Sequence, residues 1–377
     1  MLDKQKFTTD LEYLVNIDSG SYVREGVNKI GNWFAEKFTN MGWNIKWFDL
    51  APKINGRSFL TFSQHDKKFD LLILVHLDTI FPNGEAKKRP FSVVGTRFQG
   101  PGVADMKSGL LFTYYALQQL QQEGRLTANI GVFFNGEHEI SCPNTRKLIE
   151  EFSQNSKAAI TAEPARSNGA YVNRRKGVGR YKLKFLGRSA HSGVNPEEGI
   201  DAVDELAHWV LFLKGLSDPE KGVYINSGVV KGGVSINSVP GEAELLVETR
   251  FNDMESGNKI EQSIKHKLTS PFNKQIKIEL EGGIKRPPMI PTEETHRLCR
   301  IIEDVGKEYH TEVIWATSGG GSDASFAAAL GTPAVCGLAA VGGDLHSDSE
   351  YLETQDVEVR FNIYKESIYR ISTLYKR

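Results

Sequence analysis

The chain has 377 residues, of which 40% are apolar, and its 46 basic and 47 acidic side chains give a formal net charge of -1. A single hydrophobic core stops growing at about 250–300 residues, so this length predicts two domains. The near-zero charge gives no electrostatic reason to expect a nucleic acid or an anionic membrane as a partner. A small ligand is favoured instead.

The cysteines and the distribution of apolar residues indicate in which cellular compartment the protein is expected. Cys142, Cys299 and Cys336 are odd in number and far apart, which argues against a disulfide framework or a thiolate zinc site. No stretch approaches about 18 uninterrupted apolar residues, and the first residues lack the apolar core of a signal peptide. We therefore expect a cytoplasmic protein with no membrane partner.

The first part of the chain alternates helices with short apolar segments. Apolar residues from Val27 to Met41 recur at helical spacing and predict an amphipathic helix that ends at Gly42. Apolar runs bounded by turn signals predict strands within 43–50, 69–78, 129–136 and 158–164, and helices are expected near 106–122 and 144–152. This alternation predicts an α/β fold in which helices flank a buried central mixed sheet.

The pattern then changes to that of a compact α+β unit. Its strands are expected at 179–185, 222–230, 242–251 and 274–280, and its helices at roughly 199–216 and 256–269. After Pro287 and Pro288 the α/β pattern returns. The simplest organisation is a larger domain, residues 1–176 and 287–377, into which a smaller domain, residues 177–286, is inserted.

Polar residues with metal-binding side chains follow several of the predicted strands. His76 and Asp78 end the most apolar run, and ligands of open α/β sheets gather beyond such strand ends. His76 could bind a metal while Asp78 orients its other ring nitrogen, because side chains two residues apart share a face. Asp105 follows the rigid turn at 100–102. Taken alone, His76 could simply bond its neighbour and Asp105 could cap a helix.

Glu139 and Glu163 also follow predicted strands, and His346 lies in a loop rich in Gly and Asp. Acidic residues in such places usually face solvent. Together with His76 and Asp105, however, they supply two histidines and three carboxylates. This set suits a pair of zinc-like ions that share one bridging carboxylate, although other divalent metals use similar ligands.

Motifs along almost the whole chain resemble those of one family of di-zinc metallopeptidases. They are VNIDSGS at 15–21, HLDT at 76–79, GPGVADMKSG at 100–109, AEP at 162–164, GRSAHSG at 187–193, GGVSINSVP at 232–240, GGGSDAS at 319–325 and LHSDSEY at 345–351. The family includes glutamate carboxypeptidase, acetylornithine deacetylase and succinyl-diaminopimelate desuccinylase, and the chain is most similar to bacterial glutamate carboxypeptidase. No single motif would be specific for this family, but the eight motifs together are.

The resemblance implies a role for each candidate ligand. Asp105 would bridge two Zn²⁺ ions. His76 and Glu163 would complete the site of one ion, and Glu139 and His346 that of the other. The resemblance therefore implies two ions in each subunit.

The resemblance also implies a homodimer whose inserted domain acts as a dimerising lid. His191 of one subunit would polarise the scissile carbonyl in the active site of the other, assisted by Asn237, while Asp78 would orient a metal-binding histidine. Judged without the family, His191 beside Gly and Ser looks like a loop histidine with no function.

One position departs from the family pattern. Where the family has Asp-Glu-Glu, this chain has Glu137, His138 and Glu139, so His138 occupies the place of the general base. A histidine can accept a proton near neutral pH, but two nearby cations disfavour imidazolium. His138 could instead bind a metal and displace the water. Glu137 could replace the base only if the strand end turned it inward, because neighbouring strand residues face opposite ways.

Arginines and glycines are candidates for binding a substrate carboxylate. Arg250 and Arg286 match arginines that the family places near this group, and arginine suits forked recognition of a carboxylate. Arg250 could equally be a solvated outward residue. Gly320 and Gly321 could let backbone N–H groups approach the carboxylate, since their run lacks the lysine of a phosphate loop. The basic run at 173–176 is expected to be solvated hinge surface.

The sequence thus predicts a metal-dependent hydrolase of amide bonds next to a free carboxylate, of carboxypeptidase or N-acyl-amino-acid deacylase type. Its substrates would be small peptides or N-acyl amino acids. The alternative is a catalytically impaired relative that binds metal and peptide-like ligands. His138 favours the alternative, whereas the retained ligands, His191 and Asn237 favour the hydrolase.

Overall fold

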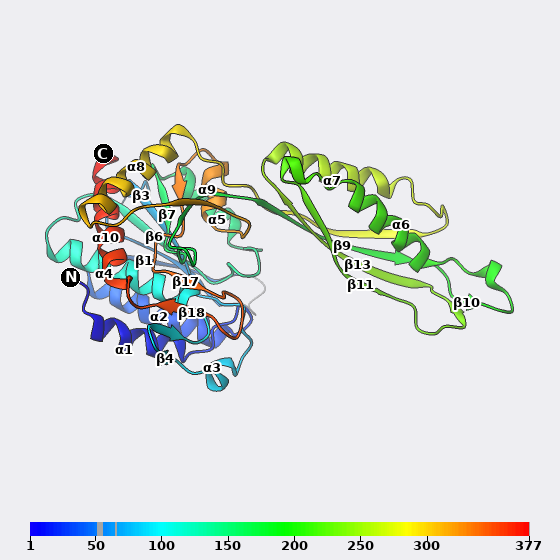
Figure 1. Cartoon of the computed structure of the whole chain (residues 1–377), viewed down its shortest axis with the longest axis horizontal. Helices are drawn as coiled ribbons and strands as arrows, with labels where there is room; N and C mark the ends of the chain where they lie inside the picture. Colours follow the sequence, from blue (N-terminus) through cyan, green and yellow to red (C-terminus); the bar gives the residue numbers. More distant parts are fainter. Residues whose placement is uncertain (51–55, 65, 377) are drawn as a thin grey trace. The chain divides into compact units, whose positions relative to one another are not determined.

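The computed structural model describes residues 1–50, 56–64 and 66–376. It divides into two compact units (Figure 1). The larger unit comprises Met1–Arg174, Pro291–Ser318 and Ser322–Arg377, and the smaller unit comprises Arg175–Ile290 and Gly319–Gly321. Within the described residues, no helix combines the length and the apolar character that crossing a bilayer requires.

The larger unit is built on a central mixed sheet with the strand order β1-β2-β6-β3-β7-β16. These strands are β1 (Asn44–Phe48), β2 (Ser58–Phe62), β3 (Leu71–His76), β6 (Ile130–Asn135), β7 (Ala159–Thr161) and β16 (Ala334–Val335). The pairs β1–β2 and β2–β6 are antiparallel, whereas β6, β3, β7 and β16 are parallel. Every residue of β3 and β6 is buried, as expected for parallel strands covered on both faces. The predicted α/β fold with a mixed sheet is confirmed.

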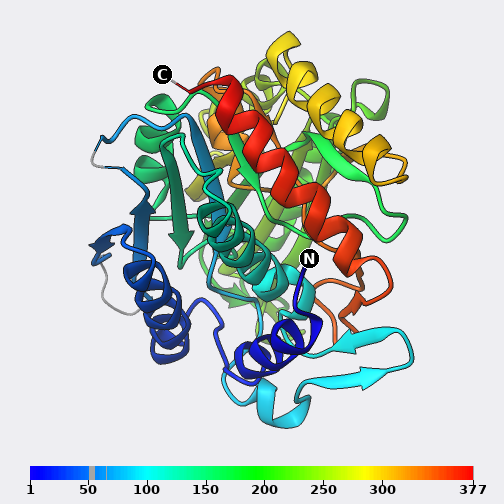
Figure 2. The same ribbon diagram turned by 90° about the vertical axis from the view of Figure 1, so that its left-hand side faces the viewer.

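Helices cover both faces of this sheet. The helices of the larger unit are α1 (Lys4–Val15), α2 (Arg24–Asn40), α4 (Ser108–Gln122), α5 (Arg146–Gln154), α8 (Glu293–Glu308), α9 (Ala324–Ala329) and α10 (Val357–Leu374), with the short α3 (Glu85–Lys88) away from the sheet (Figure 1). Figure 2 shows α10, in red, packed against α4 and α8. Helix α2 buries its predicted apolar stripe and ends before Gly42, whose φ of 82° suits a glycine after a helix.

A second sheet of the larger unit, with the order β17-β18-β5-β4, was not predicted. Its strands are β4 (Ser92–Val94), β5 (Arg97–Gln99), β17 (Gly342–Gly343) and β18 (Tyr351–Glu353). Because β18 pairs with β5, the loop after Gln99 and the loop between β17 and β18 leave the same small sheet. These two loops contain Asp105 and His346, so the sheet brings together residues that are far apart in the sequence.

Two other segments were missed or wrongly interpreted. The charges of the N-terminal segment obscured Phe7, Leu11 and Leu14, which are buried at helical spacing in α1. The basic run at 173–176 is not simply solvated surface, because it overlaps strand β8 (Tyr171–Arg175), which pairs with β15 (Trp315–Ser318). Arg175 is only 2% exposed. The charge-run rule failed here because tertiary contacts bury Arg175, and its Nη1 donates to two backbone carbonyl groups.

The smaller unit is an α+β unit. Its main sheet has the order β11-β13-β9-β14, formed by β9 (Gly177–Leu186), β11 (Tyr224–Gly232), β13 (Glu242–Phe251) and β14 (Lys277–Arg286). Helices α6 (Ala202–Gly215) and α7 (Met254–Leu268) cover one face (Figure 1). A short pair of β10 (Ala190–His191) and β12 (Ser238–Val239) and the single turns Pro196–Glu198 and Pro219–Lys221 complete it. Alternate residues of β13 are buried, as its period of two predicted.

Helix α4 approaches the end of β7 closely at Gly109. A Cβ atom at this position would lie 1.9 Å from the carbonyl oxygen of Ala162, next to Glu163. We expect Gly109→Ala to lower the free energy of unfolding by about 1–3 kcal/mol, because the helix must move away. Chemical denaturation measures this. Gly215→Ala is the control, since a Cβ there meets nothing within 4 Å, and equal effects of the two changes would contradict the prediction.

Candidate metal centre

The candidate ligands come from loops that follow strands of the larger unit. His76 is the last residue of β3, Glu139 follows β6 and Glu163 follows β7. Asp105 lies in the short irregular helix Val103–Lys107 before α4, and His346 lies between β17 and β18. Because β3, β6 and β7 are parallel neighbours, their carboxyl ends open at the same edge of the sheet.

The structure brings these five residues together. Oδ1 of Asp105 lies 3.1 Å from Nε2 of His76, and Oδ2 lies 3.3 Å from Nε2 of His346. Oε1 of Glu139 is 3.4 Å from the same nitrogen of His346. The two oxygens of Asp105 therefore face different histidines. A carboxylate that bridges two cations has this arrangement.

These separations fit the size of a metal ion. Zinc bonds of about 2.0–2.1 Å in tetrahedral geometry place two ligand atoms about 3.3 Å apart. Ligand atoms of His76, Asp105 and Glu139 all lie within 4.8 Å of one another, and so do those of His76, His138 and Glu163. Because the residues also provide only nitrogen and carboxylate oxygen donors, they fit divalent cations of the zinc type.

The electrostatics indicate a surplus of negative charge. Hydrogen bonds to Asp105 and Glu139 raise the pKa of His346 to about 10. Burial alone would lower the pKa of His76, but its hydrogen bond to Asp105 and the nearby carboxylates raise it well above its usual value. Burial would likewise raise the pKa of Asp105, but the two histidines hold it well below its usual range. Histidines that retain protons this strongly mark a place where a cation is favoured.

The loop that contains Asp105 is held by Glu350. The Glu350 carboxylate accepts hydrogen bonds from the backbone N–H groups of Gly102, Ala104 and Asp105, at 3.0–3.2 Å. Asp105 has φ -113° and ψ 91°, and helix α4 begins only at Ser108, so the interpretation of Asp105 as a helix cap is wrong. Its carboxylate is left to face the two histidines.

Asp78 supports the site in a different way from the one expected. Nδ1 of His76 donates to the backbone carbonyl oxygen of Asp78 at 2.9 Å, while Oδ1 of the Asp78 carboxylate is 3.7 Å away. The carboxylate instead accepts from the backbone N–H groups of His138 and Glu139, at 3.1 and 3.0 Å, and from the Ser21 hydroxyl at 2.7 Å. Asp78 thereby fixes both the ring of His76 and the segment after β6.

His138 is buried beside the ligands. Its Nδ1 donates to Oδ1 of Asp323 at 2.9 Å, and its Nε2 lies 3.5 Å from Oε1 of Glu163. Asp323 also accepts from the side chain of Asn135 at 2.7 Å. Sequence reasoning missed Asp323 and Asn135. Asp323 stands in the motif GGGSDAS, but only the fold brings this loop next to the end of β6.

Glu137 does not point to the cluster. Its carboxylate accepts from the side chain of Asn144 at 2.7 Å and from the backbone N–H groups of Asn144 and Thr145, at 2.9 and 3.3 Å. These contacts hold the turn before α5. The structure therefore offers no support for Glu137 as a replacement base.

The remaining candidates belong to the smaller unit. His191 is exposed on β10, and the loops of His191 and Asn237 lie side by side because β10 pairs with β12 and the N–H of Ser192 donates to the carbonyl of Asn237. Nδ1 of His191 accepts from the N–H of Gly193 at 3.1 Å. This antiparallel pairing brings together the two residues that the resemblance assigns to polarising the scissile carbonyl, although they are far apart in the sequence.

The arginines and glycines also gather in the smaller unit. Arg250 donates to Glu248 at 2.6 Å and to the carbonyl oxygen of Gly319 at 2.7 Å, so it is not a simple outward residue. Arg286 is 4% exposed, and its Cδ would lie 2.6 Å from a Cβ built on Gly321. Arg175 donates to the carbonyl oxygens of Gly320 and Gly321 at 3.1 and 2.8 Å. Arginines thus surround the glycine run, and Arg175 is one that sequence reasoning missed.

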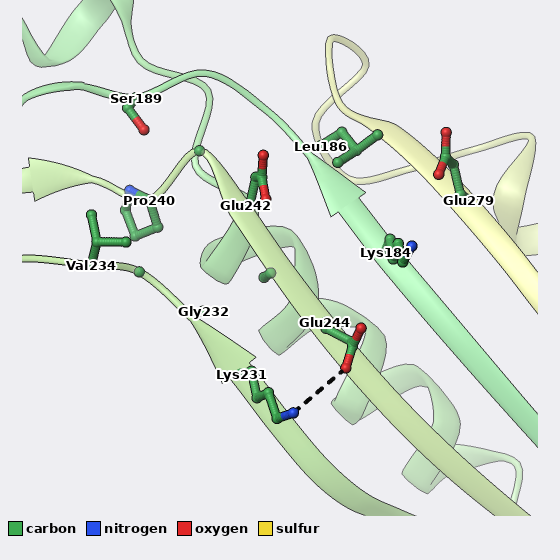
Figure 3. Close-up of a pocket in the computed structure, with 13 residues that line it drawn as sticks. Lys184, Leu186, Ser189, Lys231, Gly232, Val234, Pro240, Glu242, Glu244 and Glu279 are labelled. Atoms are coloured by element: carbon green, nitrogen blue, oxygen red, sulfur yellow. Dashed lines mark ion pairs between the residues drawn. The ribbon is translucent and has the colours of Figure 1, made fainter.

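A pocket of about 710 Å³ lies on the helix-free face of the smaller unit's sheet (Figure 3). It is lined by charged residues that include Lys184, Lys231, Glu244 and Glu279, and none of the predicted site residues lines it. Lys231 and Glu244 form a long ion pair of 4.0 Å. Glu244 also pairs with Lys182 at 2.7 Å, and the described residues that line the pocket include no histidine, so it lacks the ligand set of the metal cluster.

A mixed sheet whose parallel strands gather histidines and carboxylates at their carboxyl ends is typical of metal-dependent hydrolases. The sequence matches the model of Peptidase family M20/M25/M40 over residues 72–370, and the chain belongs to this family. It is 26% identical over 358 residues to Carboxypeptidase G2 of Pseudomonas sp., covering 93% of this chain and 85% of that protein. It is also 27% identical over 194 residues to acetylornithine deacetylase of Pasteurella multocida, covering 48% and 50% of the two chains.

Solved structures show the same fold. A tripeptidase from Staphylococcus aureus has a TM-score of 0.79 at 19% identity and covers 99% of this chain and 100% of its own. An M20 family metallo-carboxypeptidase from Sulfolobus solfataricus has a TM-score of 0.78 at 17% identity with the same coverage. The chain is therefore a member of a family of metal-dependent peptidases and amidohydrolases with a shared architecture.

Proposed function

We propose that this protein hydrolyses an amide bond next to a free carboxylate, in small peptides or N-acyl amino acids, and that it uses two Zn²⁺ ions per subunit. The main support is the cluster in which the two oxygens of Asp105 face His76 and His346 separately. The names of the relatives, a carboxypeptidase and a deacetylase, support the substrate class.

Bound zinc ions would supply the positive charge that polarises the carbonyl and acidifies a water molecule. Asp105 would bridge the two ions. His76 and Glu163 would hold one of them, and Glu139 and His346 the other. Asp78 keeps the segment after β6 in place through its bonds to the N–H groups of residues 138 and 139.

Residues 1–176 and 287–377 would form the catalytic domain, and residues 177–286 the dimerising lid of a cytoplasmic enzyme. Two observations on the smaller unit support its role as an interface. Strand β11 is an edge strand, and its Val229 and Val230 are exposed. An edge with exposed apolar residues favours pairing with another chain.

The substrate carboxylate would be bound by Arg286, with help from Arg250 and from the backbone at Gly320 and Gly321. Arg286 is the stronger candidate, because it is buried directly beside Gly321. A buried guanidinium such as Arg286 gains most from a forked contact with a carboxylate.

A substrate panel tests the proposed function. We expect the zinc-loaded protein to cleave N-acyl amino acids or peptides with a C-terminal glutamate, and to lose this activity on chelation and regain it with zinc. Amidation of the substrate carboxylate should lower kcat/KM by about 10–100-fold, the cost of a lost charged hydrogen bond. Cleavage that persists without metal, or equal rates on the amidated substrate, would contradict the proposal.

Complementation between two inactive variants tests the shared active site. His191→Ala removes the group donated to the neighbouring subunit, and Glu163→Ala disables a subunit's own metal site. After random mixing, hybrid dimers contain one intact site, so we expect about a quarter of natural activity to return. Each variant mixed with itself is the control. A fully active monomer, or proven hybrids without activity, would rule out the shared site.

A second candidate function is that of a metal-binding relative with impaired hydrolysis. The observation that favours it is that His138 stands where the family has the carboxylate of a general base. Its ring is hydrogen-bonded to Asp323 and lies beside Glu163. This candidate predicts that calorimetry detects binding of zinc and of an N-acyl amino acid while no product is released. Rapid product release would exclude it.

A further inference from the structure

His138 reproduces the geometry of His76. Their rings are stacked in parallel, with centroids 4.1 Å apart and an interplanar angle of 6°. Each ring donates its Nδ1 proton to an aspartate 2.9 Å away: His76 to the backbone carbonyl of Asp78, and His138 to the carboxylate of Asp323. A metal-binding histidine usually has one nitrogen fixed by such an acceptor while the other binds the ion. His138 therefore has the support that a ligand needs.

The other ring nitrogens share the same side of the cluster. Ligand atoms of His76, His138 and Glu163 lie within 4.8 Å of one another. Nε2 of His138 is 3.5 Å from Oε1 of Glu163, close to the separation of about 3.3 Å for two ligands of one zinc ion. His138 and Glu163 are 9% and 5% exposed, so little water competes for this space.

Asp323 is itself held firmly. It is 3% exposed, and its Oδ2 accepts from Nδ2 of Asn135 at 2.7 Å. Its Oδ1, which accepts from His138, also accepts from Sγ of Cys142 at 3.3 Å. Asn135 is the last residue of β6 and Cys142 lies in the turn beyond it, so the carboxylate joins two parts of the fold. The ring of His138 cannot rotate without breaking a charge-assisted hydrogen bond.

We infer that His138 is a ligand of the ion held by His76 and Glu163, and that Asp323 is the residue that positions its ring. This inference rests on the metal centre of the proposed function. Asp105, whose Oδ1 lies 3.1 Å from Nε2 of His76, would be the fourth donor to this ion. Four protein ligands make a closed zinc site, which leaves no position for water.

The second ion is different. Glu139, His346 and Asp105 offer it three donors, which leaves a position open for water or substrate. His346 is also half-exposed, whereas the ligands of the first ion are buried. The centre therefore consists of one closed, tight site and one open, weaker site, and the chemistry is confined to the open one.

Zinc titration in competition with a chromophoric chelator tests the inference. The natural protein should show two zinc sites of different affinity. Asp323→Asn should weaken the tighter site by about 10–100-fold, the usual effect of losing the group that orients a ligand. His138→Ala should weaken it by at least as much, and both changes should leave the weaker site nearly unaltered. His296→Ala and Asp304→Asn, which change exposed residues of α8, are the matched controls.

A spectroscopic measurement separates direct binding from a structural effect. In protein with ¹⁵N-labelled histidine, zinc should move the Nε2 resonance of His138 to the position of a metal-bound nitrogen while Nδ1 remains protonated. His138→Gln serves as a second variant that keeps most of the side-chain volume. It should lose the same zinc affinity without a comparable loss of stability in the metal-free protein.

The outcomes distinguish this inference from the proposed function. Unchanged affinities in His138→Ala, or an Nε2 resonance that zinc does not move, overturn the ligand role of His138 while leaving the metal centre intact. Two zinc sites that respond as described in a protein without hydrolytic activity support the inference and overturn the proposed hydrolysis. Absence of any zinc binding by the natural protein overturns both.

Discussion

Replacement of His138 by glutamate is expected to raise the turnover of N-acyl amino acids or C-terminal glutamyl peptides by about 10²–10⁴-fold, the range that a general base contributes. The physical reason is that Asp323 holds one ring nitrogen of His138 and the other faces Glu163 in the metal site, so neither nitrogen is placed to accept a proton from water. A glutamate would restore a proton-accepting carboxylate beside the ions. Zinc content at saturating zinc should remain nearly unchanged, because the other ligands are retained. Steady-state kinetics and metal analysis measure both quantities.

His138→Gln is the control for this gain, because glutamine has the size of glutamate but accepts no proton at neutral pH. It should not raise turnover. If the natural protein already acts quickly and His138→Glu slows it, His138 works as a base or contacts the substrate. The account of this position as an impairment would then be wrong.

Asp105→Ala is expected to have the largest effect on metal binding, since this residue faces both histidines of the cluster. Loss of an orienting group alone costs about 10–100-fold in metal affinity, so loss of the bridging ligand should cost more than about 100-fold and abolish turnover. Atomic absorption on dialysed protein measures the bound zinc. Asp348→Ala changes a carboxylate that is 91% exposed and should leave zinc content unaltered.

Retention of both ions in Asp105→Ala would remove Asp105 from the bridging role. Retention of one ion would show that Asp105 is a ligand of only one of the two ions. The metal-free variant should unfold at nearly the same temperature as the metal-free natural protein, because removal of this carboxylate leaves the loop anchored by Glu350 through the N–H groups of residues 102 and 104.

The sequence was sufficient for those features that depend on local pattern. Continuous apolar runs predicted β3 and β6, and helical spacing with a following glycine predicted α2. The rule that ligands gather at the carboxyl ends of strands in open α/β sheets predicts from the sequence that His76, Glu139 and Glu163 lie together. Local patterns suffice in such cases because the spacing of apolar residues within a segment predicts which face of the strand or helix is buried.

Features that depend on tertiary contacts were not predictable. Asp323 and Asn135 are 188 positions apart and meet only because the loop before α9 approaches the end of β6. Arg175 looked like a solvated residue of a basic run, yet it is buried and donates to the carbonyl groups of residues 320 and 321. The departure at His138 was visible in the sequence, but its hydrogen bond to Asp323 was not. Side-chain pairs of this kind carry no local signal.

Diffraction data collected at the zinc absorption edge from crystals of the zinc-loaded protein test the central claim most directly. We expect two anomalous peaks in the larger unit, one beside His76 and Glu163 and one beside Glu139 and His346, with Asp105 in contact with both. The bonds should be about 2.0–2.2 Å long. Zinc peaks that lie outside this cluster, or a single peak that Asp105 does not contact, would contradict the proposed metal centre and the hydrolysis assigned to it.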